Sequence, residues 1–389
     1  MKKISADYIY PGNTTPIKNG VIVYDTDGKI TELLNPIETK INWDDVERFN
    51  GIICPGFVNT HCHLEFSYLK GKIAEETQLH GFVKDIISLR ENFSDKERLD
   101  AISLAEQEMI KNGIVAVGDI SNGSSTFEHK EKSQLNYHTF IEVFGSNPKI
   151  AEAAFKHAES VYNRYFDKER ASITPHATYS VSDNLVKLIN VHAVANNSLI
   201  SIHNQETASE NAFFKEGNGA MFDFLNIANK TNNQFVPTGK NALPSFLSKY
   251  KNLNKTLLVH NTFTEKKDVL WAQNYADNIF WCFCPNANEY IEGKQPDYSL
   301  FKDERCTVGT DSLASNWSLS ILDELKTITT RDSSIPLTTL IKWATFNGAQ
   351  FLGFEKLGSI EKEKTPGLNL ITNIVSQKLN ANSIIKKII

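Results

Sequence analysis

The chain has 389 residues, of which 41% are hydrophobic and 22% charged, with a formal net charge of −5. This globular composition supplies a large core, and without a basic excess a nucleic-acid partner is not expected. The N-terminal "MKKISADYIY" lacks the apolar segment of a signal peptide, and no run approaches the roughly 18 apolar residues of a membrane span.

The first fifty residues are typical of short β-strands joined by turns. In "GVIVYDTDGKITELL" the pair Asp27 and Gly28 separates two β-rich runs and predicts a hairpin. After Phe354 the pattern is again β, in "GLNLITNIV" and "NSIIKKII". We therefore expect residues 1–54 and 355–389 to meet in one small β domain, and residues 55–354 to form a separate domain.

Between these ends, short apolar runs alternate with segments of helical length. The runs are continuous rather than alternating, as in parallel strands that are covered on both faces. Helices are expected from Asp95 to Asn112 and from Ser182, a good N-cap, and a long, partly helical connection covers residues 207–254. Eight such runs predict an α/β fold of the (β/α)8 TIM-barrel type; they cover residues 51–63, 113–120, 137–145, 171–177, 198–206, 255–261, 278–285 and 306–311.

The five cysteines are few and odd in number, which argues against a disulfide framework and favours a reducing cytoplasm. Cys282 and Cys284 are two residues apart in the seventh run. Residues two apart on a strand share a face, so both are expected to enter one core. A metal or redox role for this pair is the alternative.

Catalytic groups of such a barrel lie at the carboxyl ends of its strands. Five of the ten histidines fall at run ends, and the eighth run ends in a carboxylate. A single histidine at a strand end is usually a hydrogen-bonded core residue, but three histidines and one aspartate on one rim suit a borderline divalent ion such as zinc. The residues at this rim are His61, His63, His176, His203, Glu206, His260 and Asp311.

Four ordered motifs carry a resemblance to a known family: "PGFVNTHCHLE", "HNQET", "VHN" and "GTDSLASN". Together they resemble the amidohydrolase superfamily, and within it the aminohydrolase branch of adenosine, cytosine, guanine and S-adenosylhomocysteine/methylthioadenosine deaminases. The likeness covers nearly the whole chain, and it implies that the terminal β domain is a β-sandwich. It also implies the metal ligands His61, His63, His203 and Asp311, with Glu206 as proton shuttle and His260 beside the reacting water.

Two other metal chemistries can be weighed against this one. Binuclear members of the superfamily use a carbamylated lysine on strand four, but "ASITPHATYS" contains no lysine, which favours one metal ion. His63 and Glu65 match the His-x-Glu half of the zinc deaminase signature. The Pro-Cys-x-x-Cys half is absent, because the chain offers only "CFCPN". Zinc is the expected ion, with iron as the alternative.

The hypothesis is hydrolytic deamination of a ring carbon. The metal would acidify a water molecule, from which Asp311 takes a proton, while His260 orients the resulting nucleophile. Glu206 would protonate the neighbouring ring nitrogen. The resemblance suggests a substrate contact for His176. It also suggests that Glu75 or Glu76 binds ribose hydroxyls, although solvent exposure is the default for both, and Glu65 is expected to be structural.

The expected substrate is a small adenine-bearing nucleoside, of the adenosine, S-adenosylhomocysteine/methylthioadenosine or aminofutalosine type. Guanine, cytosine and s-triazine substrates stay open, as does chloride rather than ammonia as leaving group. A non-catalytic scaffold barrel is the alternative of another class, but relatives of that kind have lost ligands that this chain keeps. Such barrels commonly pair, which favours a homo-oligomer.

Overall fold

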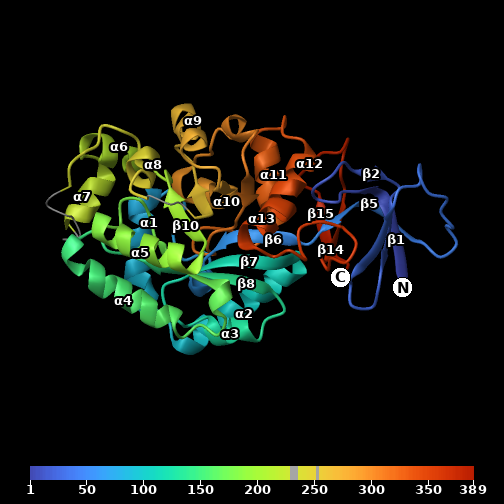
Figure 1. Cartoon of the computed structure of the whole chain (residues 1–389), viewed down its shortest axis with the longest axis horizontal. Helices are drawn as coiled ribbons and strands as arrows, with labels where there is room; N and C mark the ends of the chain where they lie inside the picture. The colour runs from blue at the N-terminus through green and yellow to red at the C-terminus, as the bar shows by residue number, and fades with distance from the viewer. Residues whose placement is uncertain (228–234, 251–253) are drawn as a thin grey trace.

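Two parallel sheets of four strands lie at the centre of the molecule (Figure 1). The computed structural model describes residues 1–227, 235–250 and 254–389. In one sheet the strand order is β6-β7-β8-β9, and in the other β10-β11-β12-β13. All eight predicted runs thus contain a parallel strand, namely β6 (Phe57–Cys62), β7 (Ile114–Ser121), β8 (Asn136–Val143), β9 (Ala171–Pro175), β10 (Ile200–Asn204), β11 (Thr256–His260), β12 (Ile279–Phe283) and β13 (Cys306–Val308).

The two sheets approach each other at the carboxyl ends of their outer strands. A parallel bridge joins Cys62, at the end of β6, to Asp311, which follows β13. On the opposite side a bridge joins Ala177 to His203, and the amide of His203 donates to the carbonyl of His176 at 3.0 Å. These contacts hold the carboxyl ends of both sheets together, and the result is a TIM-barrel-like α/β domain.

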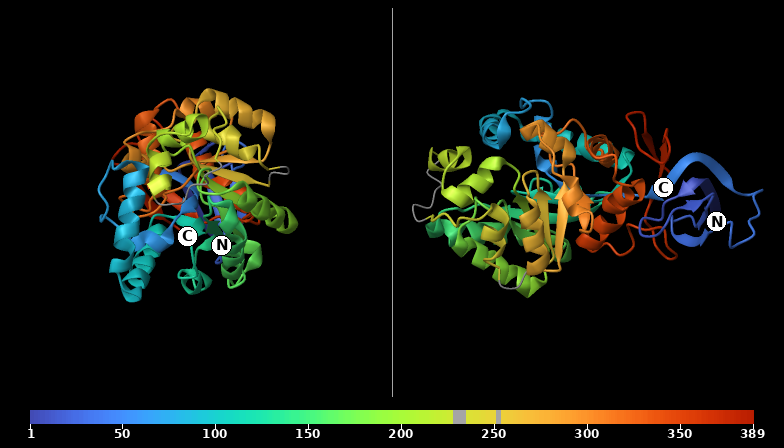
Figure 2. Two further views of the ribbon diagram at one scale, coloured as in Figure 1. Left: turned by 90° about the vertical axis from the view of Figure 1, so that its left-hand side faces the viewer. Right: turned by 90° about the horizontal axis from the view of Figure 1, so that it is seen from above.

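Helices follow the strands and lie outside the sheets in both views of Figure 2. Ser94 begins α2 with a capping box and Ser182 caps α5, so both predicted helix starts are confirmed. No helix of the described residues is both apolar and long enough to cross a membrane. The helices are α1 (Gln78–Leu89), α2 (Asp95–Lys111), α3 (Phe127–Glu131), α4 (Ala151–Tyr162), α5 (Asp183–Asn196), α6 (Ala208–Glu216), α7 (Ala220–Ile227), α8 (Ala242–Leu247), α9 (Lys266–Tyr275), α10 (Pro285–Glu292), α11 (Ile321–Arg331), α12 (Leu337–Lys342) and α13 (Gly348–Leu352).

The connection predicted over residues 207–254 is partly helical, because it contains α6, α7 and α8. Its segments 228–234 and 251–253 lie outside the described residues. In Figure 1, α6 and α7 lie at the end of the molecule opposite the chain termini. Helices α6 and α7 of this connection therefore lie far from the terminal strands.

Alternate residues of the central strands enter different parts of the core. On β12, Trp281 and Phe283 belong to the largest apolar cluster, whereas Cys282 belongs to a second one together with Cys284. Both cysteines are fully buried, and all five thiols of the chain are free. The prediction that Cys282 and Cys284 share one core is therefore confirmed.

Strands from both chain ends form one seven-stranded sheet, at the right of Figure 1. The predicted hairpin at Gly28 joins β3 to β4, and β5 pairs with both β1 and β14. The two-layered β-sandwich stays a prediction. The strands of this sheet are β1 (Lys2–Ile9), β2 (Ile17–Lys18), β3 (Val21–Tyr24), β4 (Ile30–Leu34), β5 (Glu47–Pro55), β14 (Leu368–Thr372) and β15 (Ile384–Lys387).

The first apolar run, expected to be one strand, is divided between the two parts of the molecule. β5 ends at Pro55 in the terminal sheet, and β6 begins at Phe57 in the central one. Gly56 lies between them, where an added Cβ would be 2.3 Å from Val115 Cγ1 and 2.8 Å from the Pro366 carbonyl oxygen. Only glycine fits this crossing, so the single-strand expectation was wrong at this position.

Candidate active site

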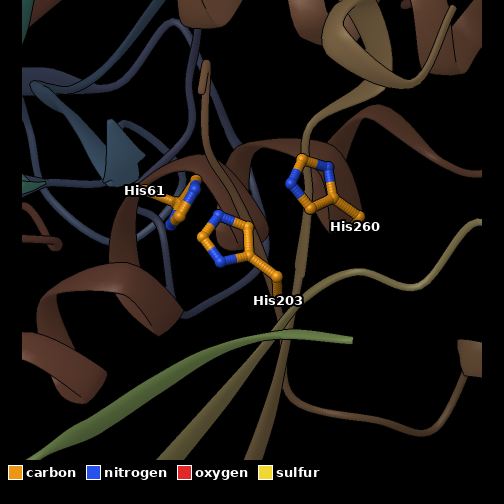
Figure 3. Close-up of side chains that lie close together, drawn as sticks. All are labelled: His61, His203 and His260. Carbon is orange, nitrogen blue, oxygen red and sulfur yellow. The ribbon is translucent and has the colours of Figure 1, made fainter. Parts of the chain in front are cut away.

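Three imidazole rings converge where the central strands end. His61 lies on β6, His63 directly after it, and His203 on β10. The Nε2 atom of His63 is 3.2 Å from Nε2 of His61 and 3.3 Å from Nε2 of His203. Figure 3 shows His61 and His203 directed toward each other, with His260 beside them. The three Nε2 atoms thus share one small space.

The carboxylate of Asp311 faces the same space. Its Oδ1 atom is 3.4 Å from Nε2 of His63 and 3.6 Å from Nε2 of His61. Its Oδ2 atom accepts a 2.5 Å hydrogen bond from Ser315 Oγ. Burial alone would raise the pKa of Asp311, but the adjacent imidazoles of His61, His63 and His260 hold that pKa far below its usual range. Asp311 is therefore an anionic donor.

The surroundings of the imidazoles favour their neutral form. Burial lowers the pKa of His63 to about 4, although the nearby Asp311 opposes this shift. Burial also lowers the pKa of His61. The pKa of His203 is lowered more strongly, because the neighbouring imidazole rings add to the effect of burial. A neutral imidazole keeps the lone pair that metal ligation requires.

The orientation of His203 is fixed from behind. Its Nδ1–H donates to the carbonyl oxygen of His176 at 2.7 Å, which leaves Nε2 as the atom that faces the other histidines. His176 itself is half-buried, and its Nδ1 is 2.9 Å from Ser180 Oγ. Its ring lies 4.8 Å from that of His203 and 4.3 Å from that of Phe144. His176 thus borders the imidazole cluster without entering it.

Glu206 and His260 form the next layer of the site. Nε2 of His260 is 3.7 Å from a carboxylate oxygen of Glu206 and has no hydrogen-bond partner among the described residues. Nδ1 of His260 is 2.9 Å from Asn288 Oδ1, which fixes the ring. Burial raises the pKa of Glu206 well above its usual value, and the charge of Asp311 raises it further. Both effects favour the protonated form of Glu206.

Four non-glycine residues at the strand ends adopt left-handed backbone conformations. Their φ angles are +47° at Gln205, +72° at His260, +57° at Asn261 and +56° at Asp311. Such conformations cost of order 1–3 kcal/mol each and cluster at functional sites, where the surrounding structure enforces them. They redirect the chain at the ends of β10 and β11 and at Asp311, beyond β13.

The cluster fits a divalent ion. A tetrahedral zinc ion with Zn–N distances of about 2.05 Å would separate neighbouring nitrogens by about 3.3 Å, close to the 3.2 and 3.3 Å observed here. Three neutral nitrogens in such proximity, with one carboxylate, form a donor set typical of zinc. The residues present thus match the expected cofactor in kind and spacing.

The remaining candidates lie around this centre. Glu65 accepts hydrogen bonds from the backbone and side chain of Asn122, and burial raises its pKa to about 7. Glu75 and Glu76 are both exposed. Glu75 accepts a 2.9 Å bond from the indole of Trp317. Glu65 and Glu75 therefore have structural partners of their own.

The loop after β13 is held by the residues that follow Asp311. Ser315 donates to the Asp311 carboxylate, and the Asn316 amide donates to the carbonyl oxygen of Thr310 at 2.7 Å. Both contacts agree with the expectation that Ser315 and Asn316 brace this loop.

Sequence reasoning missed two buried acids near the histidines. Asp119 on β7 accepts a hydrogen bond from the amide of Leu64, next to His63, and pairs with the buried Lys130 at 2.5 Å. Glu142 on β8 places a carboxylate oxygen 3.5 Å from Nδ1 of His203. Each is a charged residue inside an apolar run, and that irregularity in the sequence could have revealed both.

An α/β domain with parallel strands and a cluster of histidines and one aspartate at their carboxyl ends is an arrangement suited to metal-assisted hydrolysis. The Amidohydrolase family model matches residues 52–389. The chain belongs to the amidohydrolase family.

Individual relatives narrow the likeness. The chain is 30% identical over 336 residues to the aminodeoxyfutalosine deaminase of a Nitratiruptor species, covering 83% of this chain and 79% of that protein. It is 28% identical over 337 residues to an adenosine deaminase of Helicobacter pylori, and this match covers 82% of this chain and 79% of that protein. A crystal structure of Helicobacter pylori aminofutalosine deaminase with methylthio-coformycin superposes on this structure with a TM-score of 0.79 at 24% identity. The superposition covers 97% of this chain and 94% of that one. This last likeness establishes the fold.

Proposed function

We propose that the protein is a mononuclear metal-dependent hydrolytic deaminase of an adenine-bearing nucleoside, which releases ammonia. The observation that carries the proposal is the convergence of three neutral imidazoles and one carboxylate beside Glu206 and His260. The relatives named above, which are adenosine and aminodeoxyfutalosine deaminases, support deamination as the reaction and a purine as the ring that is attacked. The substrate is thus a small molecule.

His61, His63, His203 and Asp311 would hold the ion. Zinc suits this set of nitrogen and oxygen donors, and iron is the alternative. When bound, such an ion lowers the pKa of a water molecule from about 15.7 toward roughly 7. The absence of lysine from β9 and its following loop supports a single ion rather than a lysine-bridged pair.

The protein's own groups then move the protons. Asp311, which is anionic, accepts a proton from the water that attacks the ring carbon. His260, fixed by Asn288, orients that water through its free Nε2 atom. Glu206 donates its proton to the adjacent ring nitrogen, so that negative charge does not accumulate there. Asp311 then passes the water's proton to the leaving nitrogen, the carbon–nitrogen bond to the amine breaks, and ammonia departs. As the ring carbonyl forms, the added hydroxyl group returns its proton to the Glu206 carboxylate.

Several finer features belong to the same proposal. His176 borders the imidazole cluster and is assigned a substrate contact. The eight parallel strands are taken to close into one (β/α)8 barrel over residues 55–354, with a β-sandwich domain from residues 1–54 and 355–389. A cytoplasmic location and a homo-oligomer stay predictions from the sequence, as does a ribose contact by Glu75 or Glu76.

Steady-state assays of ammonia release test the function directly. Adenosine, methylthioadenosine, S-adenosylhomocysteine and aminodeoxyfutalosine are compared with guanine, cytosine and amino- and chloro-s-triazines. We expect turnover of at least one adenine nucleoside, with kcat/KM a hundredfold or more above that for the other rings. Preferential turnover of guanine, cytosine or a triazine would replace the proposed substrate, and no turnover of any by zinc-loaded protein would contradict a deaminase.

A further inference from the structure

Glu142 is a buried carboxylate that the proposed mechanism does not use. It lies near the carboxyl end of β8, on the same rim as the imidazole cluster, and is only 7% exposed. Its Oε1 atom is buried and has no hydrogen-bond partner among the described residues. A buried carboxylate oxygen without a partner is costly, so it indicates a group that arrives from outside the protein.

The neighbouring acid, Glu65, differs in this respect. Its two oxygens accept bonds of 3.0 and 3.2 Å from the backbone amide of Asn122, and one accepts a 2.6 Å bond from the Asn122 side chain. Glu65 and Glu142 thus form one acidic wall at the ends of β6 and β8, but only Glu142 keeps an oxygen for another donor.

A role in bracing His203 does not account for that oxygen. The distance from Glu142 Oε1 to His203 Nδ1 is 3.5 Å, too long for a good hydrogen bond. The Nδ1–H of His203 is already bonded to the carbonyl oxygen of His176 at 2.7 Å. For the same reason Nδ1 of His203 is not free to join Glu142 and His176 as ligands of a second metal ion.

We propose that Glu142 contacts the substrate and hydrogen-bonds a hydroxyl group of its sugar, an inference that rests on the proposed function. The adenosine portion that these nucleosides share offers few donors besides the reacting amine, and these are the sugar hydroxyls. A hydroxyl both donates and accepts, so it pairs with a carboxyl group in either protonation state. Glu142 thereby selects nucleosides over the free base.

The test compares adenosine with 2′-deoxyadenosine and 3′-deoxyadenosine in three variants. Glu142→Met has the same length without oxygens, Glu142→Gln keeps one acceptor, and Glu65→Gln is the matched control in the same wall. A hydrogen bond to a carboxyl group corresponds to roughly threefold in kcat/KM when the group is neutral and up to about a hundredfold when it is charged. We expect the wild type to prefer adenosine over one of the deoxynucleosides by a factor in this range.

Glu142→Met should lose that preference by slowing adenosine alone, Glu142→Gln should keep part of it, and Glu65→Gln should keep it in full. Zinc affinity, measured by competition with a chelator, should be unchanged in Glu142→Met. Equal losses for all three nucleosides, weakened zinc binding, or a preserved preference in Glu142→Met would each overturn the sugar contact. Those outcomes leave adenosine deamination by the wild type intact, whereas a wild type inactive on every nucleoside would overturn the proposed function itself.

Discussion

Replacing Glu206 by glutamine removes one proton and almost no volume. The side chain is 5% exposed, and its backbone amide donates to Glu210, a bond that the substitution does not touch. Glutamine cannot donate a proton to the ring nitrogen, and general acid–base catalysis contributes roughly 10²- to 10⁴-fold. We therefore expect kcat to fall by that factor, or about 3–5 kcal/mol of activation free energy.

The assay measures ammonia release together with the metal content of the same protein samples. Glu206→Gln should keep its metal, because Glu206 is not among the expected ligands, and its melting temperature should match the wild type. Glu216→Gln, at the exposed end of helix α6, which begins two residues after Glu206, is the control and should keep full activity. A kcat for Glu206→Gln within threefold of the wild type would refute the assigned role, and so would loss of the metal.

Three further variants test the structure around the site. Burial and the charges of Arg170 and Lys130 lower the pKa of His138 to about 3. Below pH 6.5 this histidine therefore binds a proton in the unfolded chain but not in the folded one, so the wild type should lose about 2 kcal/mol of unfolding free energy relative to His138→Gln between pH 7 and pH 5. A difference between the two proteins that stays constant with pH would contradict this. Lys130→Met leaves Asp119 buried without its 2.5 Å partner and should cost roughly 3–5 kcal/mol in chemical denaturation; a loss below about 1 kcal/mol would show that the pair is not coupled. Gly309→Ala places a Cβ 2.8 Å from the carbonyl oxygen of His61, so it should weaken zinc affinity and cost about 1–3 kcal/mol, whereas unchanged zinc affinity would argue against this contact.

Much of the fold could be predicted because parallel strands covered on both faces leave continuous apolar runs. The rim residues could be predicted too, since His61 and His63 are two apart at the end of one run and His203 ends another. The division of the first run at Gly56 could not, because the reason is a close approach to Val115 and Pro366, distant in sequence.

Glu142 illustrates a second limit. Within "YHTFIEVFG" it is a charged residue in a largely apolar strand. The sequence does not indicate that one of its carboxylate oxygens lacks a hydrogen-bond partner among the described residues. That property depends on the positions of Asn122, His176 and His203 on three other segments. Strand periodicity predicts which residues reach the rim, but not which of their atoms are already bonded.

Titration of metal-free protein with zinc tests the central claim most directly. The metal is removed with a chelator, zinc is added in known ratios, and ammonia release from the preferred nucleoside is followed at each ratio. One tetrahedral donor set built from His61, His63, His203 and Asp311 predicts that activity rises linearly and saturates at one zinc ion per chain. Saturation at two ions per chain, or full activity without added metal, would contradict a mononuclear metal-dependent deaminase.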